Sequence, residues 1–374
     1  MMKEALENWQ EERYCKDKIR AIDAKYEAQK IAFAPFSFQA ILVLRKLGIL
    51  ESLLDAGDEG LTLQQLMDKH HLGSYQLKVL LEMALSMDVV KWKKDSSPKA
   101  FVLGKIGFFL ETDKLTIANM DFAQDVCYQG MFKLMESIQN GKPEGLKVFG
   151  DWKTIYEGLS QLPQDVQHSW FQFDHFYSDG AFPQALKFVF SNSHKRLMDI
   201  GGNTAKWALA CANFNDEVNV TIVDLPGQAK MATEKIKAAG FSDRINVYEA
   251  NMLSPTSSLP GDHDAVWMSQ FLDCFSLSEI TAILEKVFKA VDENAEIFVM
   301  EPLWDKQNYP AASYSLHATS LYFTAMANGN SKMYGYRELC DAIEAGGFQL
   351  ADEIHQLGPN DYSILKFKKR PVNV

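Results

Sequence analysis

Alternation of β-like and helical runs in the second half of the chain constrains the fold more than any other feature. Short apolar runs such as "TIVDL" and "IFVME" are separated by longer runs with helical spacing, such as "SLSEITAILEKVFKAV". This alternation predicts a doubly wound, mostly parallel sheet. The predicted strands are 196–202, 218–226, 245–252, 264–272, 295–303, 348–358 and 361–369. Only a Pro-Asn turn separates the last two strands, which predicts an antiparallel hairpin at one edge of the sheet.

The first third of the chain predicts helices followed by a wing. Residues 34–54, 61–72 and 74–90 carry apolar residues at helical spacing, with Thr62 and Ser74 as N-caps. Two β-like runs follow around a polar turn that ends at Pro98. Three helices and a wing are typical of a winged-helix domain. Such a domain either binds DNA or serves as a structural or dimerisation module.

The charge and cysteine content favour the dimerisation role in a reducing compartment. The chain has 374 residues and a net charge of −11, whereas binding to DNA phosphates needs clustered Lys and Arg. Its five cysteines are dispersed, and no run reaches the ~18 apolar residues that span a membrane. The N-terminus lacks the apolar core of a signal peptide. We therefore expect a cytoplasmic protein that binds neither nucleic acid nor membrane.

Three domains follow from these patterns. Residues 1–110 predict the helical winged-helix dimerisation domain, and residues 195–374 predict the α/β domain. Between them, residues 111–194 read as helices rich in aromatic side chains, which predicts a connector that roofs a pocket. No group of His, Cys, Asp or Glu has the spacing of metal ligands, so we expect no metal.

A glycine turn after the first predicted strand of the α/β domain points to a bound cofactor. Gly201 and Gly202 follow the strand directly, and Asp224 ends the next strand, where an acid binds ribose hydroxyls. The turn lacks the G-x-G-x-x-G spacing of nicotinamide and flavin sites, and the chain has no phosphate-binding loop motif. Asp199 would repel a pyrophosphate but suits a cation. S-adenosylmethionine, which carries an adenosine, a sulfonium and an ammonium, fits best.

The same residues resemble those of a known family. The segments "LMDIGG", "TIVDLP", "VYEANML", "IFVMEP" and "YRELCDAIEAGGF" resemble the class I S-adenosylmethionine-dependent methyltransferases. The whole chain is similar to the two-domain small-molecule O-methyltransferases, whose winged-helix domain typically forms a homodimer. The resemblance implies a Rossmann-like sheet with a C-terminal antiparallel hairpin, placed after an all-helical winged-helix domain. It also implies a homodimer that binds a small-molecule substrate.

The resemblance also assigns cofactor-binding residues. It implies that the cofactor is held by Asp199, Gly201, Gly202, Asp224, Leu225, Asn251, Met252 and Ser269. Leu225 and Met252 would lie against the adenine. Ser269 stands where many members have a lysine, and Ala205 replaces a family glycine. These departures suggest an altered site that still binds the cofactor.

The expected catalytic histidine is missing. The family's L-H-D-W segment reads Leu-Asp-Cys-Phe here, so Asp273 stands where the histidine base should be. Glu301 matches a glutamate that orients that base, whereas Met333 replaces a second one. Three alternatives remain: Asp273 is the base, with its pKa raised by burial and Glu301; transfer proceeds by proximity onto an already nucleophilic atom; or the fold has been repurposed. Asp273 could also be a loop aspartate without chemistry.

Aromatic side chains predict the substrate pocket. Candidate wall residues are Phe171, Phe176, Trp267, Phe271, Tyr322, Phe323 and Met326, although the same residues could be core. His175, His263 and His317 are candidate replacement bases, with His175 and His317 on the substrate side. We expect an O-methyltransferase that acts on a small, aromatic or conjugated hydroxylated molecule. The alternative is a repurposed fold that binds the cofactor without methylating, including a cofactor-sensing winged-helix regulator.

Overall fold

The computed structural model describes residues 9–371, except for the side chains of residues 11 and 175–178. The chain divides into two compact units, residues 17–124 and residues 1–16 with 125–374. The predicted connector, 111–194, is therefore shared between the two units.

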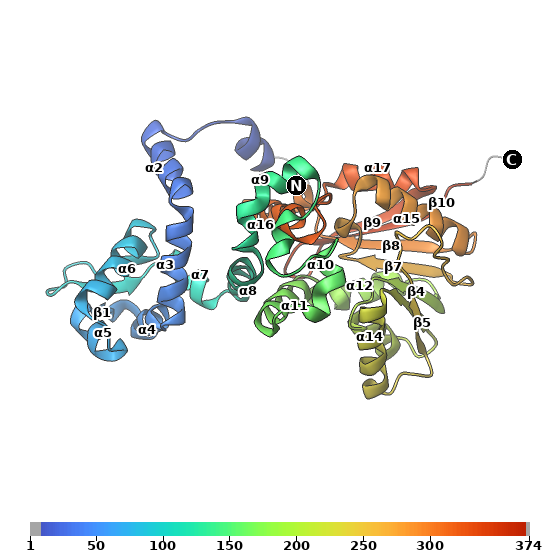
Figure 1. Ribbon diagram of the computed structural model, residues 1–374, viewed down its shortest axis with the longest axis horizontal. Coiled ribbons are helices and arrows are strands. Elements are labelled where there is room, and N and C mark those ends of the chain that lie inside the picture. Colours follow the sequence, from blue (N-terminus) through green and yellow to red (C-terminus); the bar gives the residue numbers. More distant parts are fainter. Residues whose placement is uncertain (1–8, 372–374) are drawn as a thin grey trace. The chain divides into compact units, whose positions relative to one another are not determined.

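The smaller unit contains a helical core and a short sheet (Figure 1). Its helices are α2 Ala21–Ala32, α3 Ala34–Lys46, α4 Ile49–Ala56, α5 Leu63–His70, α6 Ser74–Ser86, α7 Lys105–Thr112 and α8 Lys114–Phe122. Its strands are β1 Leu61–Thr62, β2 Val90–Trp92 and β3 Ala100–Leu103. Leucines at helical spacing, among them Leu50, Leu53, Leu77 and Leu81, are fully buried and form its core.

Two details of this unit differ from the sequence prediction. The domain is not all helical, because Leu61 and Thr62 pair with Phe101 and Ala100 to extend the predicted two-stranded wing to three strands. Thr62 caps α5 as predicted, since its side chain accepts a hydrogen bond from the Gln65 N–H group. Ser74 is the first residue of α6 and not its N-cap, which is Gly73.

The larger unit is a sheet of seven strands in the order β6-β5-β4-β7-β8-β10-β9. The strands are β4 Arg196–Ile200, β5 Asn219–Asp224, β6 Ile245–Glu249, β7 Ala265–Ser269, β8 Glu296–Glu301, β9 Phe348–Leu357 and β10 Tyr362–Lys369. The first five strands are parallel. The predicted C-terminal hairpin is confirmed, with β10 antiparallel to both β8 and β9.

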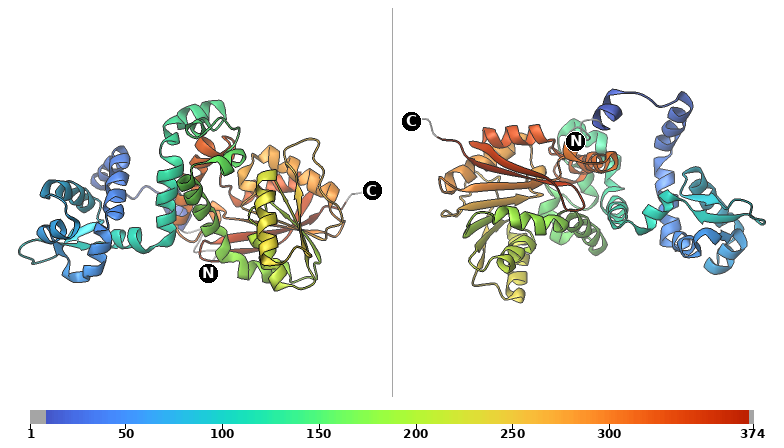
Figure 2. Two further views of the ribbon diagram at one scale, coloured as in Figure 1. Left: turned by 60° about the horizontal axis from the view of Figure 1, so that its bottom comes forward. Right: turned by 180° about the vertical axis from the view of Figure 1, so that it is seen from behind.

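Helices of the larger unit lie on both faces of the sheet and beside it (Figure 1 and Figure 2). They are α9 Leu134–Asn140, α10 Ile155–Gly158, α11 Gln164–Ser178, α12 Phe182–Val189, α13 Lys206–Phe214, α14 Pro226–Ala239, α15 Leu277–Ala290, α16 Pro310–Tyr322 and α17 Tyr336–Ala345. In Figure 1, α12 and α14 lie below the sheet and α15 and α17 above it. The strand order reverses between β4 and β7, which creates the switch point where ligands of such sheets bind. Among the residues described, no helix is both long and apolar enough to cross a membrane.

Candidate active site

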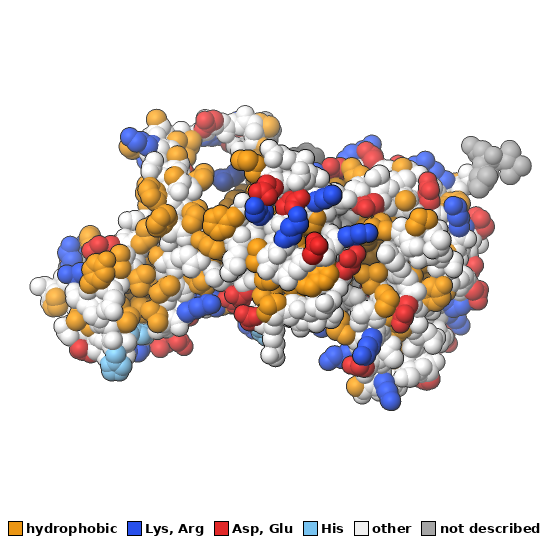
Figure 3. Space-filling model, viewed as in Figure 1, with side chains coloured by type: hydrophobic (Ala, Val, Ile, Leu, Met, Phe, Trp, Pro, Cys, Tyr) orange, Lys and Arg blue, Asp and Glu red, His pale blue; other side chains and the backbone are white. Residues whose placement is uncertain are grey.

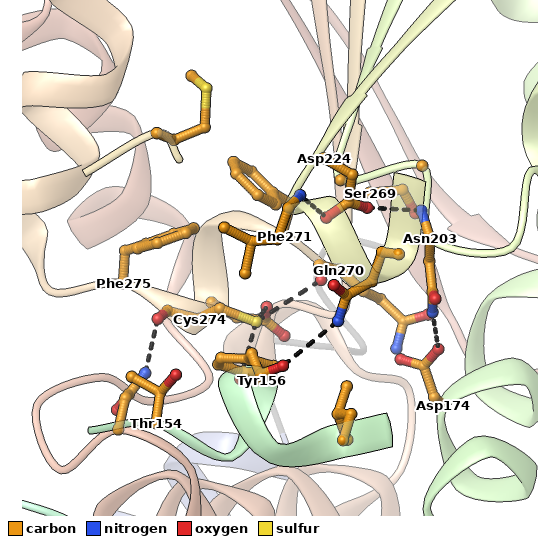
Figure 4. Close-up of a pocket in the computed structure, with 18 of the residues that line it drawn as sticks. Thr154, Tyr156, Asp174, Asn203, Asp224, Ser269, Gln270, Phe271, Cys274 and Phe275 are labelled. Atoms are coloured by element: carbon orange, nitrogen blue, oxygen red, sulfur yellow. Dashed lines mark hydrogen bonds between the residues drawn. The ribbon is translucent and has the colours of Figure 1, made fainter. Parts of the chain in front are cut away.

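A cavity of about 310 Å³ lies at the carboxyl ends of the central strands, where the glycine turn was expected to hold a ligand. Residues that follow β4, β5 and β7 line one side of it. Helices α10, α11 and α16 supply an aromatic wall that includes Tyr156, Trp170, Phe173 and Tyr322 (Figure 4). Tyr156, Trp170 and Phe173 belong to the predicted connector, and their place in this wall accounts for part of its aromatic content.

The turn after β4 is built around Asp224. Its carboxylate accepts hydrogen bonds from the N–H groups of Asn203, at 2.8 Å, and of Leu225, at 2.7 Å. Gly201 has a φ of +79°, and a Cβ atom there would lie 2.4 Å from the Phe271 ring. Only glycine satisfies both conditions, so the chain can turn sharply beneath the cavity.

Four oxygen atoms in or near this turn are buried without a hydrogen-bond partner. Within the described part of the chain, they are Asp199 Oδ2, Asn203 Oδ1, Thr204 Oγ1 and Ser269 Oγ, and all four residues line the cavity. Leaving a buried polar atom unsatisfied costs roughly 1–3 kcal/mol. A set of such atoms around one cavity therefore indicates a polar ligand.

Burial favours the protonated, neutral form of the two acids beside the turn, Asp199 and Asp224. Burial, followed by the charge of Asp224, raises the pKa of Asp199 to about 8. Burial also raises the pKa of Asp224 to about 6, while hydrogen bonds from Asn203 and Leu225 oppose this shift. A cationic ligand would favour the ionised form of both carboxyl groups.

Asp273 lies in the short helical turn η8, Leu272–Cys274, which follows β7. It is 4% exposed and lines the cavity. Burial raises the pKa of its carboxyl group to about 7, whereas a hydrogen bond from Cys274 lowers it. A carboxyl group whose pKa is close to neutral can exchange a proton with a substrate far more readily than an ordinary aspartate.

Glu301 stands behind this turn and does not line the cavity. Its Oε1 accepts hydrogen bonds from the N–H groups of Phe271 and Leu272, both at 3.0 Å. Burial, together with the charge of Asp273, raises its pKa well above the usual range. Glu301 therefore holds the backbone that carries Asp273, and the geometry gives it a positioning role.

A chain of hydrogen bonds runs from Tyr156 through Cys274 to Asp273, and Figure 4 labels its first two residues. The Tyr156 hydroxyl donates to Cys274 Sγ at 3.0 Å, and the thiol lies 3.4 Å from Asp273 Oδ1. The same thiol lies 3.8 Å from the Gln270 carbonyl oxygen. No sequence pattern indicated these contacts, because Tyr156 and Cys274 are 118 residues apart.

Most residues predicted to bind ligands line this one cavity. All eight predicted cofactor residues do so, as do Asp273, Phe271, Trp267, Tyr322 and Phe323. Asn251 already uses its side-chain oxygen to accept the Leu253 N–H group. The side chains of His175 and Phe176 lie outside the described residues.

Other predicted residues lie elsewhere. His317 is exposed and packs on Trp304, with ring centroids 4.9 Å apart, because its position on α16 faces away from the cavity. Met326 is buried behind the wall, where its sulfur fills the space beside Gly130. His263 precedes β7 and so lies at the opposite end of the sheet. Phe171 is not among the residues that line the cavity.

Asp174 and Asn328 line the cavity but were not predicted. Asp174 accepts a hydrogen bond from the Asn203 side chain at 3.3 Å, and burial, followed by the charge of Asp273, raises its pKa to about 7. The only sequence signal was a single acid within the aromatic run "WFQFDHF". Asn328 donates to the Cys274 carbonyl oxygen at 2.6 Å, and so holds the same loop from a third element.

Comparison with known proteins decides the family. Residues 25–96 match the Dimerisation2-like domain, and residues 173–349 match the O-methyltransferase domain. The chain belongs to the S-adenosylmethionine-dependent O-methyltransferase family. It is 25% identical over 324 residues to L-tyrosine C(3)-methyltransferase of Streptomyces lavendulae, a match that covers 85% of each chain. It is 31% identical over 111 residues to 3-hydroxy-5-methyl-1-naphthoate 3-O-methyltransferase of Streptomyces sahachiroi, covering 30% of this chain and 32% of the relative.

Solved structures of methyltransferases share the fold. The S-adenosylmethionine-dependent methyltransferase SibL superposes with a TM-score of 0.69 at 21% identity, covering 91% of this chain and 98% of SibL. PigF with S-adenosylhomocysteine superposes with a TM-score of 0.67 at 18% identity, covering 94% of this chain and all of PigF. The predicted fold class, a Rossmann-like methyltransferase sheet after a helical N-terminal domain, is confirmed.

S-adenosylmethionine is the cofactor of this methyltransferase, and the residues around the turn fit it. Asp199 would offer a carboxyl group to a cation and Asp224 one to ribose hydroxyls, and the unpartnered atoms of Asn203 and Thr204 could bind its polar groups. A Cβ atom on Gly202 would lie 2.7 Å from Asp199 Oδ2, so any larger residue there would crowd that oxygen. When bound, the cofactor supplies an electrophilic methyl group on a sulfonium. No set of three or more described His, Cys, Asp or Glu side chains is arranged to hold a metal ion.

Proposed function

We propose that this methyltransferase methylates a hydroxyl group of a small aromatic molecule and that Asp273 is the base. The observation that supports this most is the position of Asp273, a buried carboxyl group in the same cavity as the cofactor turn and the aromatic wall. Two further lining residues, Phe271 and Phe275, have ring centroids 4.8 Å apart and offer aromatic surface for a flat ring.

The proposed role of Asp273 is to hold the hydroxyl and accept its proton. The bound cofactor would supply the methyl group, with its carbon–sulfur bond breaking as the acceptor oxygen bonds to the methyl carbon, and the Asp273 carboxylate would accept the hydroxyl proton. A phenol with a pKa of about 10 is matched poorly by an ordinary aspartate with a pKa of about 3.9. Burial narrows this gap by raising the pKa of Asp273 to about 7. The base then operates near neutral pH.

Product release tests this proposal. The purified protein is incubated with S-adenosylmethionine and a panel of phenols, catechols and naphthols, and S-adenosylhomocysteine formation is measured. We expect turnover with at least one acceptor and a loss of about 10²–10⁴-fold in kcat in Asp273→Asn, the usual contribution of a general base. Asp273→His should retain more activity than Asp273→Asn. Turnover that is unchanged in Asp273→Asn would refute the role of the base.

A second candidate reaction is methylation of a ring carbon. The relative that matches over 85% of each chain is named an L-tyrosine C(3)-methyltransferase, and its name places the methyl group on carbon. Asp273 would serve this reaction too, because removing the phenol proton raises the electron density of the adjacent ring carbon. Proton NMR of the product separates the two outcomes, since carbon methylation removes a ring proton and oxygen methylation removes none.

We also propose that the protein is a homodimer formed through the smaller unit. Ile22, Ile31, Phe33 and Phe36 on or beside α2 and α3 are each more than half exposed. Figure 3 shows apolar side chains gathered along this stretch. A patch of this kind favours contact with a second copy. Sedimentation velocity tests the proposal: Phe36→Glu should shift the protein toward monomer, whereas Tyr75→Glu on α6 should not.

A further inference from the structure

The ionisable side chains that line the cavity are almost all acidic. Seven carboxyl groups line it, and Lys206 is the only described lysine, arginine or histidine among the lining residues. The seven are Glu157, Asp174, Asp179, Asp199, Asp224, Asp273 and Glu279. This imbalance favours a positive charge over a negative one in the cavity, because a cation promotes ionisation of the carboxyl groups whereas an anion meets no free cation among the described lining residues.

Lys206 already forms an ion pair with Asp179. Its Nζ lies 2.5 Å from Asp179 Oδ2, and it is the first residue of α13, next to the cofactor turn. The cofactor also carries a carboxylate of its own, and Lys206 is the only described cation lining the cavity that could meet it. An acceptor therefore finds no basic side chain among the described lining residues.

The acceptor side retains a buried carboxyl group after the cofactor acids are accounted for. Asp199 and Asp224 belong to the turn, and Asp174 bonds to Asn203 beside it. Asp273 is 4% exposed, and its donors are its own N–H group, that of Cys274 and the Cys274 thiol. No ion pair among the described residues includes Asp273, so its carboxyl group has no basic partner among them.

These observations predict that the cavity binds an acceptor with a positive charge better than one with a negative charge. A carboxylate that enters the cavity loses its hydration without gaining a cationic partner among the described lining residues, which weakens its binding in a buried site. An ammonium group gains from the acidic lining side chains, even without a single dedicated ion pair. Aromatic faces such as those of Trp170 and Phe173 add a further attraction for a cation.

We propose that the methyl acceptor is an aromatic molecule with a basic amine and without a carboxylate inside the cavity. This inference rests on the proposed function, which makes the cavity the binding site of the methyl acceptor. The inference itself concerns only the charge of that acceptor. It separates this protein from a relative whose named acceptor, 3-hydroxy-5-methyl-1-naphthoate, carries a carboxylate.

Binding measurements with matched ligands test the charge of the acceptor. The full chain is loaded with S-adenosylhomocysteine, and calorimetry compares tyramine, tyrosol and para-hydroxyphenylacetate, which share a phenol ring and differ in the charge of the side arm. Ammonium and carboxylate pairs built on a naphthol and on an indole extend the series. We expect the ammonium member to bind tighter by at least about tenfold in the best pair, and this ratio to shrink at high salt.

Two variants connect the preference to the cavity. Asp273→Asn should reduce the ammonium-to-carboxylate affinity ratio several-fold, because it removes a buried charge. Glu157→Gln is the matched control, since Glu157 lines the same cavity but is exposed and screened by solvent. Equal or tighter binding of the carboxylate members, or failure of every ammonium member to bind, would overturn the inference. If ammonium members bind preferentially but no S-adenosylhomocysteine forms in the turnover assay, the inference about acceptor charge stands. The proposed methylation would then be wrong.

Discussion

Glu301 accepts the backbone N–H group of Leu272 at 3.0 Å, directly ahead of Asp273 in the chain. The same oxygen accepts the Phe271 N–H group, so one buried side chain on β8 fixes the direction in which the loop after β7 leaves the sheet. This contact gives Glu301 a positioning role, like the orienting role that the family resemblance implies. Asp273 lines the cavity, and Glu301 determines where Asp273 lies.

Substitution of Glu301 should distinguish positioning from acid–base chemistry. Glu301→Gln keeps an oxygen that accepts both N–H groups, so we expect kcat/KM within a few-fold of wild type. Glu301→Ala leaves two buried donors unsatisfied and lets the loop move, and we expect a loss of about 10²-fold, as for a displacement of about 1 Å in a catalytic group. Steady-state kinetics with the acceptor found by the turnover assay measure both. A loss in Glu301→Gln as large as in Glu301→Ala would instead indicate that the charge or proton of Glu301 is required.

The thiol of Cys274 should set the pH at which Asp273 works. Its hydrogen bond stabilises the carboxylate and lowers the pKa of Asp273, opposing the effect of burial. Cys274→Ala should therefore move the acidic limb of the kcat/KM profile to higher pH, and Cys274→Ser should restore it. Tyr156→Phe removes the donor behind the thiol and should shift the limb less. Identical pH profiles in all four proteins would exclude the thiol from any influence on the base.

Two glycines provide a matched test of the cofactor turn. Gly201→Ala places a Cβ atom 2.4 Å from the Phe271 ring at a φ of +79°, so we expect S-adenosylhomocysteine affinity to fall by tenfold or more, a change of about 1.4 kcal/mol. Gly227→Ala, in α14, has no atom within 4 Å of the added Cβ. It should bind the ligand like wild type and gain about 0.5–1 kcal/mol from helix propensity. Calorimetry and urea denaturation measure the two effects, and unchanged binding in Gly201→Ala would show that the turn tolerates a side chain.

The sequence predicted the strands and helices better than the side-chain contacts of the candidate site, and the reasons are physical. Strands such as Arg196–Ile200 and the cap at Thr62 follow from local periodicity and local hydrogen bonds, which neighbouring residues determine. The contacts of Tyr156 with Cys274 and of Asp174 with Asn203 join distant segments, and no local pattern encodes them. His317 has helical spacing suited to a pocket wall, but a rotation of the helix that sequence alone does not specify leaves it exposed on Trp304. Strand β1 was missed because two residues are too few to show alternation.

Asp199 should make the stability of the protein depend on pH in a direction opposite to that of an ordinary aspartate. Its pKa is raised from 3.8 to about 8 by burial and by the charge of Asp224. Between these two values the folded protein holds a proton that the unfolded chain has released. The stabilisation from this group is therefore complete below about pH 3.8 and is lost as the pH rises to about 8. Asp199→Asn removes the titration, so the variant should gain stability relative to wild type as the pH rises through this window.

The proton on Asp199 should also affect cofactor binding, and here a rise in pH should strengthen the interaction. A cationic cofactor favours the ionised form of Asp199, so the affinity for S-adenosylmethionine should rise with pH up to about 8. S-adenosylhomocysteine lacks the sulfonium charge, and its affinity should depend on pH less. Calorimetry in two buffers of different ionisation enthalpy counts the proton released when S-adenosylmethionine binds, and Asp199→Asn should release fewer. Equal proton release in wild type and variant would place the proton on another group, with Asp224 the first to examine, because burial raises its pKa as well.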